Sequence, residues 1–155
     1  MNEIDTLNDL LNSDLSNTPT SFPVLKKSLY QLHFEAPEGG IVVDTKAHDG
    51  GKNMVFKAVL ESPVPAQATD GRQVQAGFSF MQRVFLPRPG ADEKSIAMSK
   101  QKLAQIKLGV TGSQFGSFGD PAQYLNIPFT ASVSVKNDPE YGESNEIAKF
   151  LPKKS

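Results

Sequence analysis

The sequence predicts a mainly β protein, a small barrel of five strands with one helix inserted between the third and fourth strands and a short helix before them. The clearest strand is 129–136, where Phe129, Ala131, Val133 and Val135 alternate with hydroxylated residues and a lysine. One long helical stretch, from residue 92 to about 108, separates the earlier strands from the last two. A flat antiparallel sheet leaves its edges open, and closing the sheet into a barrel removes them.

Residues 2–15 are predicted to form the short N-terminal helix. Ile4, Leu7 and Leu11 recur at helical spacing, and Asn2 is suited to the N-cap. Residues 16–23 are rich in Ser, Thr and Pro and read as a linker. The pattern leaves open whether this helix packs on its own domain or faces a partner.

The body of the chain supplies the remaining strands. Alternation predicts strands at 28–35 and 54–61, a short one at 41–43 and a long one at 73–86. Asp92 is the expected N-cap of the inserted helix, and Gly109 its expected C-terminal stop. A Gly/Ser-rich loop at 111–120 leads to a hairpin that returns through Ile147 and Phe150. This order of strands and helix is that of an OB-fold.

Composition predicts a single domain with an acidic leader. Residues 1–25 form an acidic segment and linker with four carboxylates and no Lys or Arg, and residues 26–155 form the domain. The body holds all 16 basic residues but only 13 of the 17 acidic ones, a net charge of +3. That charge is small for a nucleic-acid-binding domain, so a phosphate-binding surface has to be a local groove.

The sequence gives little support for catalysis or for metal binding. There is no Cys, which fits a reducing cytoplasm, and the two histidines lie outside any recognised motif. Asp44, His48 and Asp49 lie in a turn without metal-ligand spacing, and the glycines at 112, 116 and 119 lack the Lys-Ser/Thr of a phosphate loop. We therefore expect no enzyme, cofactor or metal; a hydrolase with an unrecognised carboxylate pair is a weaker alternative. No apolar run has membrane-spanning length, so we expect no membrane partner.

Basic and aromatic residues occur together on the predicted wet faces and loops. Proteins that bind single strands combine cations for the phosphates with rings on which bases stack. The candidate binding residues are Lys57, Arg83, Phe85, Phe115, Phe118, Lys136, Tyr141 and Lys149. Each lysine is equally readable as an ordinary surface charge, Phe85 as part of a small core under the helix, and the two loop phenylalanines as docked on the barrel's end.

The C-terminal hairpin carries a resemblance to a known family. The matching residues are Val133, Val135, Lys136, Asn145, Ile147, Phe150 and Pro152. With the preceding helix and loop, the hairpin resembles that of phage-encoded single-stranded DNA-binding proteins. The resemblance implies an OB-fold that binds single-stranded DNA without sequence preference, in phage-type replication or recombination in the host cytoplasm.

The expected partners are single-stranded DNA and, through the N-terminal segment, a replication or recombination protein. Self-association into a homo-oligomer and the preference for DNA over RNA are left open. The alternative is a protein-interaction or virion-associated β module with no nucleic-acid ligand.

Overall fold

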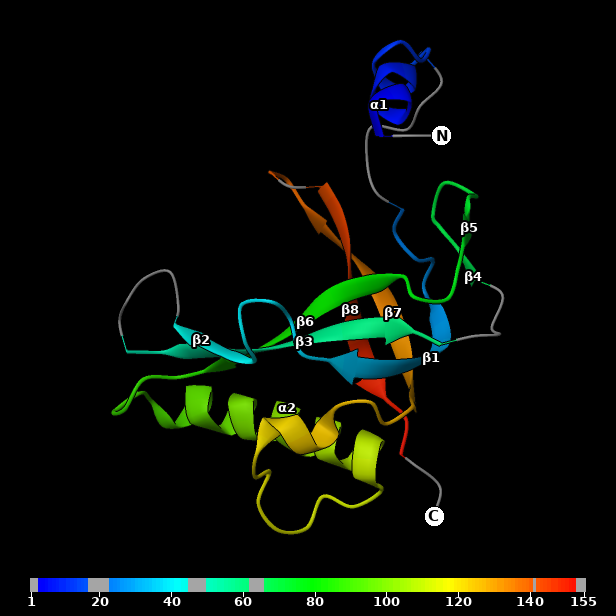
Figure 1. Ribbon diagram of the computed structural model, residues 1–155. Helices are drawn as coiled ribbons and strands as arrows, with labels where there is room; N and C mark the ends of the chain where they lie inside the picture. Colours follow the sequence, from blue (N-terminus) through cyan, green and yellow to red (C-terminus); the bar gives the residue numbers. More distant parts are fainter. Residues whose placement is uncertain (1–2, 17–22, 45–49, 62–65, 141, 153–155) are drawn as a thin grey trace.

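Figure 1 shows the computed structural model, which describes residues 3–16, 23–44, 50–61, 66–140 and 142–152. Its centre is an antiparallel six-stranded sheet in the order β2-β3-β1-β7-β8, with β6 paired to the other edge of β3. The strands are β1 (Ser28–Glu35), β2 (Val42–Asp44), β3 (Lys52–Leu60), β6 (Ser79–Leu86), β7 (Phe129–Asp138) and β8 (Gly142–Phe150). A separate two-stranded ribbon is formed by β4 (Ala66–Gln67) and β5 (Gln73–Val74). The predicted mainly β fold is thus confirmed.

The predicted strand 73–86 is in fact two strands. Gly77 lies between them with φ 95°, a conformation that favours glycine, and its N–H donates to the Leu60 carbonyl at 2.9 Å. The chain turns there, so Gln73–Val74 pairs with β4 while Ser79–Leu86 pairs with β3.

The sheet curves around one core, and its inner face follows the predicted alternation. Phe34 lies at the centre of this core, with its ring centroid 4.4 Å from that of Phe56 and 4.7 Å from that of Phe129. Buried residues of β1, β3, β6 and β7 alternate with more exposed neighbours except in β3, where Val55 and Val59 are buried on the outer face as well. The inner faces of all five long strands therefore share one hydrophobic core.

The sheet is not closed into a barrel. β6 and β8 face each other, but no ladder joins them in the described part of the chain. One bond spans this seam: the Ile147 N–H donates to the side-chain Oε1 of Gln82 at 2.9 Å. The register of β7 and β8 also shifts beside Ala148, and such bulges bend and twist a strand. The expected closed barrel is therefore absent, and along this seam a contact from a side chain stands in place of a ladder.

The long helix α2 (Glu93–Thr111) packs against β6 and β8. Its N-cap is Asp92, as predicted, whose Oδ1 accepts the Ser95 N–H at 2.8 Å and whose pKa is lowered by that hydrogen bond. The Ser99 hydroxyl donates to the Phe85 carbonyl at 2.6 Å and fastens the helix to β6.

The predicted end of this helix is wrong. The helix continues past Gly109 to its C-cap at Gly112, which has φ 87°. A Cβ on Gly109 would lie 2.6 Å from the Cβ of Phe150, so this glycine lets α2 approach β8 closely. A 3-10 turn, η1 (Pro121–Tyr124), then leads into β7.

The first helix, α1 (Glu3–Leu11), is present but ends four residues before the predicted boundary at 15, and it stands apart from the sheet (Figure 1). Leu7, Leu10 and Leu11 are exposed, so these leucines do not complete the core of the sheet. Among the described residues, no helix is both long and apolar enough to cross a membrane.

Candidate nucleic-acid interface

A groove of about 410 Å³ runs along the seam between β6, β8 and α2, and we call it the seam groove. Three cations line it, each from a different element: Arg83 of β6, Lys102 of α2 and Lys136 of β7. The other polar lining residues include Gln82, Gln105, Ser144 and Glu146. Its volume falls in the range of about 300–1,000 Å³ that is usual for ligand clefts.

The fold explains how these three cations meet. Arg83 points outward because Val84, its neighbour, occupies the core. Lys136 lies near the tip of the hairpin, opposite Ser144, where the strand has left the core. Lys102 is an exposed residue of α2 and joins the groove because the helix lies along the seam.

The electrostatics of the seam groove favour an anion weakly. No ion pair in the described part of the chain involves Arg83, Lys102 or Lys136. The Glu146 carboxylate lines the same groove and opposes them. The groove thus has a net charge of +2, enough to attract a few phosphates and far from a strongly basic surface.

A smaller hollow of about 150 Å³ adjoins the seam groove, because Lys102 lines both. Phe85, which is 47% exposed, is the aromatic residue that lines this hollow, and Met98 of α2 also lines it. The ring is on the outer side of β6, as the alternation predicts, and not in the core of the sheet. A half-exposed aromatic ring therefore lies beside Lys102, the cation that the hollow shares with the seam groove.

The other predicted residues lie elsewhere. Lys57 is half-buried on the outer face of β3, opposite Glu35, and Lys149 is exposed on β8, opposite Ser132; neither lines the seam groove. Phe115 is 85% exposed in the loop after α2. Phe118, in the same loop, stacks on Tyr124 with ring centroids 4.1 Å apart. Tyr141 lies outside the described residues.

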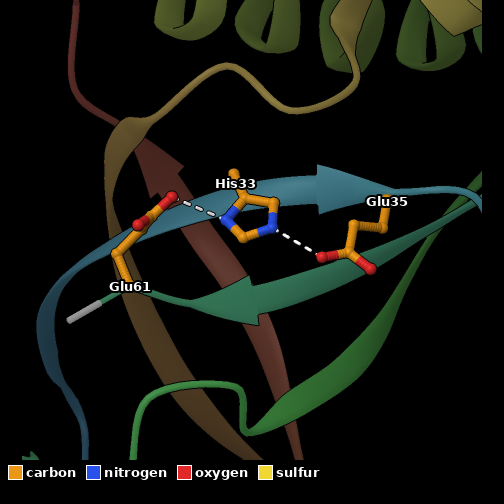
Figure 2. Close-up of polar contacts among 3 residues, drawn as sticks. All are labelled: His33, Glu35 and Glu61. Atoms are coloured by element: carbon orange, nitrogen blue, oxygen red, sulfur yellow. Dashed lines mark hydrogen bonds and ion pairs between the residues drawn. The ribbon is translucent and has the colours of Figure 1, made fainter.

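Sequence reasoning missed a charged cluster on the outer face of β1 (Figure 2). His33 Nδ1 lies 2.6 Å from Glu61 Oε1, and His33 Nε2 lies 2.7 Å from Glu35 Oε2. Burial by itself lowers the pKa of His33, but its hydrogen bonds and ion pairs with Glu35 and Glu61 outweigh burial and raise that pKa above its usual value. Both ring nitrogens donate when the ring is protonated, so the imidazole is held between two carboxylates and is not a free general base.

The outer face of the sheet is acidic at this cluster. Two carboxylates surround one imidazolium on the β1 side of β3, whereas Arg83 and Phe85 lie on the β6 side. Among the described residues, no group of His, Cys, Asp and Glu is arranged to hold a metal ion. Of the turn residues considered for a metal, His48 and Asp49 lie outside the described residues, and Asp44 pairs with Lys52.

The hairpin motif has a structural explanation. Asn145 is buried, and its Oδ1 accepts the Leu25 N–H at 2.8 Å while its Nδ2 donates to the Leu25 carbonyl at 3.0 Å. It thus pairs the start of the domain with β8 as a neighbouring strand would. Val133 and Ile147 face each other in the core. Of the motif residues, only Lys136 lines the groove as an exposed cation.

Comparisons with family models, with curated proteins and with solved structures found no significant match. The resemblance of the hairpin to phage single-stranded DNA-binding proteins therefore stays a prediction from the motif.

Proposed function

We propose that this chain binds single-stranded nucleic acid, with phosphates in the seam groove and a base stacked on Phe85. The observation that carries the proposal is the convergence of Arg83, Lys102 and Lys136, from three separate elements, beside one exposed ring. Single-strand binding needs this combination of cations and a stacking surface, and each stacked base contributes roughly 1–3 kcal/mol.

The strand connections support an OB-like arrangement for this function. β1 pairs with β3 and β7, β3 pairs with β6, β7 pairs with β8, and the helix lies between β6 and β7. An OB-fold has the same order of five strands. We take the seam between β6 and β8 as the unclosed side of such a barrel.

The hairpin motif extends the proposal to single-stranded DNA and to phage-type replication or recombination in the host cytoplasm. We propose binding without sequence preference, because contacts to phosphates and stacking on an aromatic face do not read the edges of bases. We propose a non-enzymatic role, in which the cations of the seam groove and the Phe85 ring hold the strand without changing it.

Fluorescence anisotropy with labelled oligo-dT and a duplex of equal length tests this proposal. We expect tighter binding to oligo-dT, because unpaired bases offer their faces for stacking. With three phosphates neutralised, the affinity should fall with a salt slope of about −2. Phe85→Ala should weaken binding and leave that slope unchanged. Equal affinity for both ligands, or no binding at low salt, contradicts the proposal.

A further inference from the structure

The leucine face of α1 has no partner within the described part of the chain. Leu7, Leu10 and Leu11 follow helical spacing and are between 57% and 73% exposed. An isolated helix of this length is marginal in water, and a row of exposed leucines marks a docking surface. The helix therefore needs a complementary groove to be stable.

A groove of suitable chemistry lies on α2, and we call it the helix groove. It has a volume of about 340 Å³ between α2 and the loop that follows it. Leu103, Ala104 and Phe118 supply apolar surface, and Lys100 and Lys107 add positive charge. Amphipathic helices bind in apolar grooves of this kind, with their polar residues against the rim.

The N-terminal segment and the helix groove carry opposite charges. Residues 3–14 carry Glu3, Asp5, Asp9 and Asp14 and no Lys or Arg. The helix groove itself carries Lys100 and Lys107 and no Asp or Glu. We propose that α1 of one copy of this chain docks into the helix groove of a second copy. Such charge complementarity speeds association and fixes the orientation of the partners.

The placement of the elements favours a second copy. In Figure 1, α1 and α2 lie at opposite ends of the molecule with the sheet between them. Leu25, after the linker, is fully buried and bonded to Asn145, which fixes the start of the domain on β8. When α1 of each copy docks on the next copy, one α1 stays free at one end of the assembly and one helix groove stays free at the other. The contact is therefore head-to-tail and produces chains or rings.

Sedimentation velocity of the full chain without nucleic acid tests this inference. We expect species larger than a dimer to grow with protein concentration and to dissociate as salt screens the charges. The double variant Leu7→Ser and Leu11→Ser, and separately Lys100→Glu, should each weaken association at least tenfold. Leu29→Ser and Lys94→Glu are matched controls, since both residues are exposed and neither belongs to α1 or the helix groove, and they should associate as the wild type does.

Mixing the leucine variant with the Lys100→Glu variant distinguishes docking on a second copy from docking of α1 elsewhere. The leucine variant retains its groove and the Lys100→Glu variant retains its helix, so the mixture should form a one-to-one dimer that grows no further. A monomer at all concentrations overturns the inference, because α1 then docks on its own domain or on a different protein. Association that the controls weaken equally also overturns it.

Discussion

The two edges of β6 differ in how they are joined to the neighbouring strand. Along β3, eight residues of β6 pair in continuous register from Leu86 to Ser79. Along β8, no ladder forms among the described residues, and the Ile147 N–H instead donates to the Gln82 side chain. Both edges lie on the same strand, so the strand's own propensity does not explain the difference.

The comparison shows how an open seam becomes a candidate site. A ladder joins the backbone N–H and C=O groups of both strands in hydrogen bonds and leaves no space between the strands. Where the ladder is missing, side chains from β6, β7 and α2 converge on the space and give it a charge. The seam groove therefore depends on two walls, β8 and α2, being held at a fixed distance from β6.

The largest expected effect is loss of the bonds that hold β8 to the start of the domain. In Asn145→Ala, the buried Leu25 N–H and carbonyl both lose their partner, and each such group costs roughly 1–3 kcal/mol. Urea denaturation should show the loss of stability. Asn137→Ala, an exposed residue of the same hairpin, is the control. Equal stability of the two variants would show that Asn145 does not hold this wall.

The next effect concerns the approach of α2 to β8. Gly109→Ala places a Cβ 2.6 Å from the Cβ of Phe150, and we expect it to cost about 1–3 kcal/mol even though alanine favours helix. Gly39→Ala is the matched control, because a Cβ there meets no atom within 4 Å. Thermal unfolding of both variants measures the difference. A stabilised Gly109→Ala protein would mean that the helix lies farther from the strand.

A smaller effect tests the electrostatics of the seam groove. Glu146→Gln removes the carboxylate that opposes three cations in the seam groove. Surface charges of this kind contribute up to about 1 kcal/mol, so oligo-dT binding should tighten roughly two- to fivefold. Glu143→Gln, an exposed hairpin residue outside this groove, should leave affinity close to that of the wild type. Equal tightening in both variants would point to net charge alone and not to the groove.

The smallest effect lies on the outer face of β1, where the charged groups are already bonded to one another. Because the folded protein raises the pKa of His33, its bonds to Glu35 and Glu61 stabilise the fold fully below the unfolded pKa of about 6.5. This contribution is lost as pH rises through the raised folded pKa. The stability difference between wild type and His33→Gln, within about 1 kcal/mol, should therefore shrink as pH rises, as urea titrations at several pH values can measure. A difference that grows with pH contradicts this account.

Much of the sheet was predictable because the side-chain period of a strand is local. Alternation alone placed Phe34, Phe129 and Val133 inside and Arg83 and Phe85 outside, and these faces are confirmed. The N-cap at Asp92 was predictable for the same reason, since a cap uses residues three apart.

The rest depends on contacts between distant residues. Asn145 and Leu25 are 120 residues apart, and His33 and Glu61 are 28 apart, so no local pattern reveals these bonds. Gly109 illustrates an ambiguity: glycine ends helices and also permits close packing, and only the position of Phe150 decides between them. Lys102 lies within the predicted helix, but it lines the groove only because α2 packs against β6 and β8, which the sequence does not reveal.

The most direct test of the seam groove compares two lysines of one hairpin. Lys136 and Lys149 are both exposed, but only Lys136 lines the groove. Anisotropy titrations of Lys136→Glu and Lys149→Glu with oligo-dT hold the change in net charge equal. We predict at least a fivefold loss of affinity and a shallower salt slope for Lys136→Glu, with Lys149→Glu close to wild type. Equal losses in the two variants, or a larger loss for Lys149→Glu, would contradict the placement of the ligand in the seam groove.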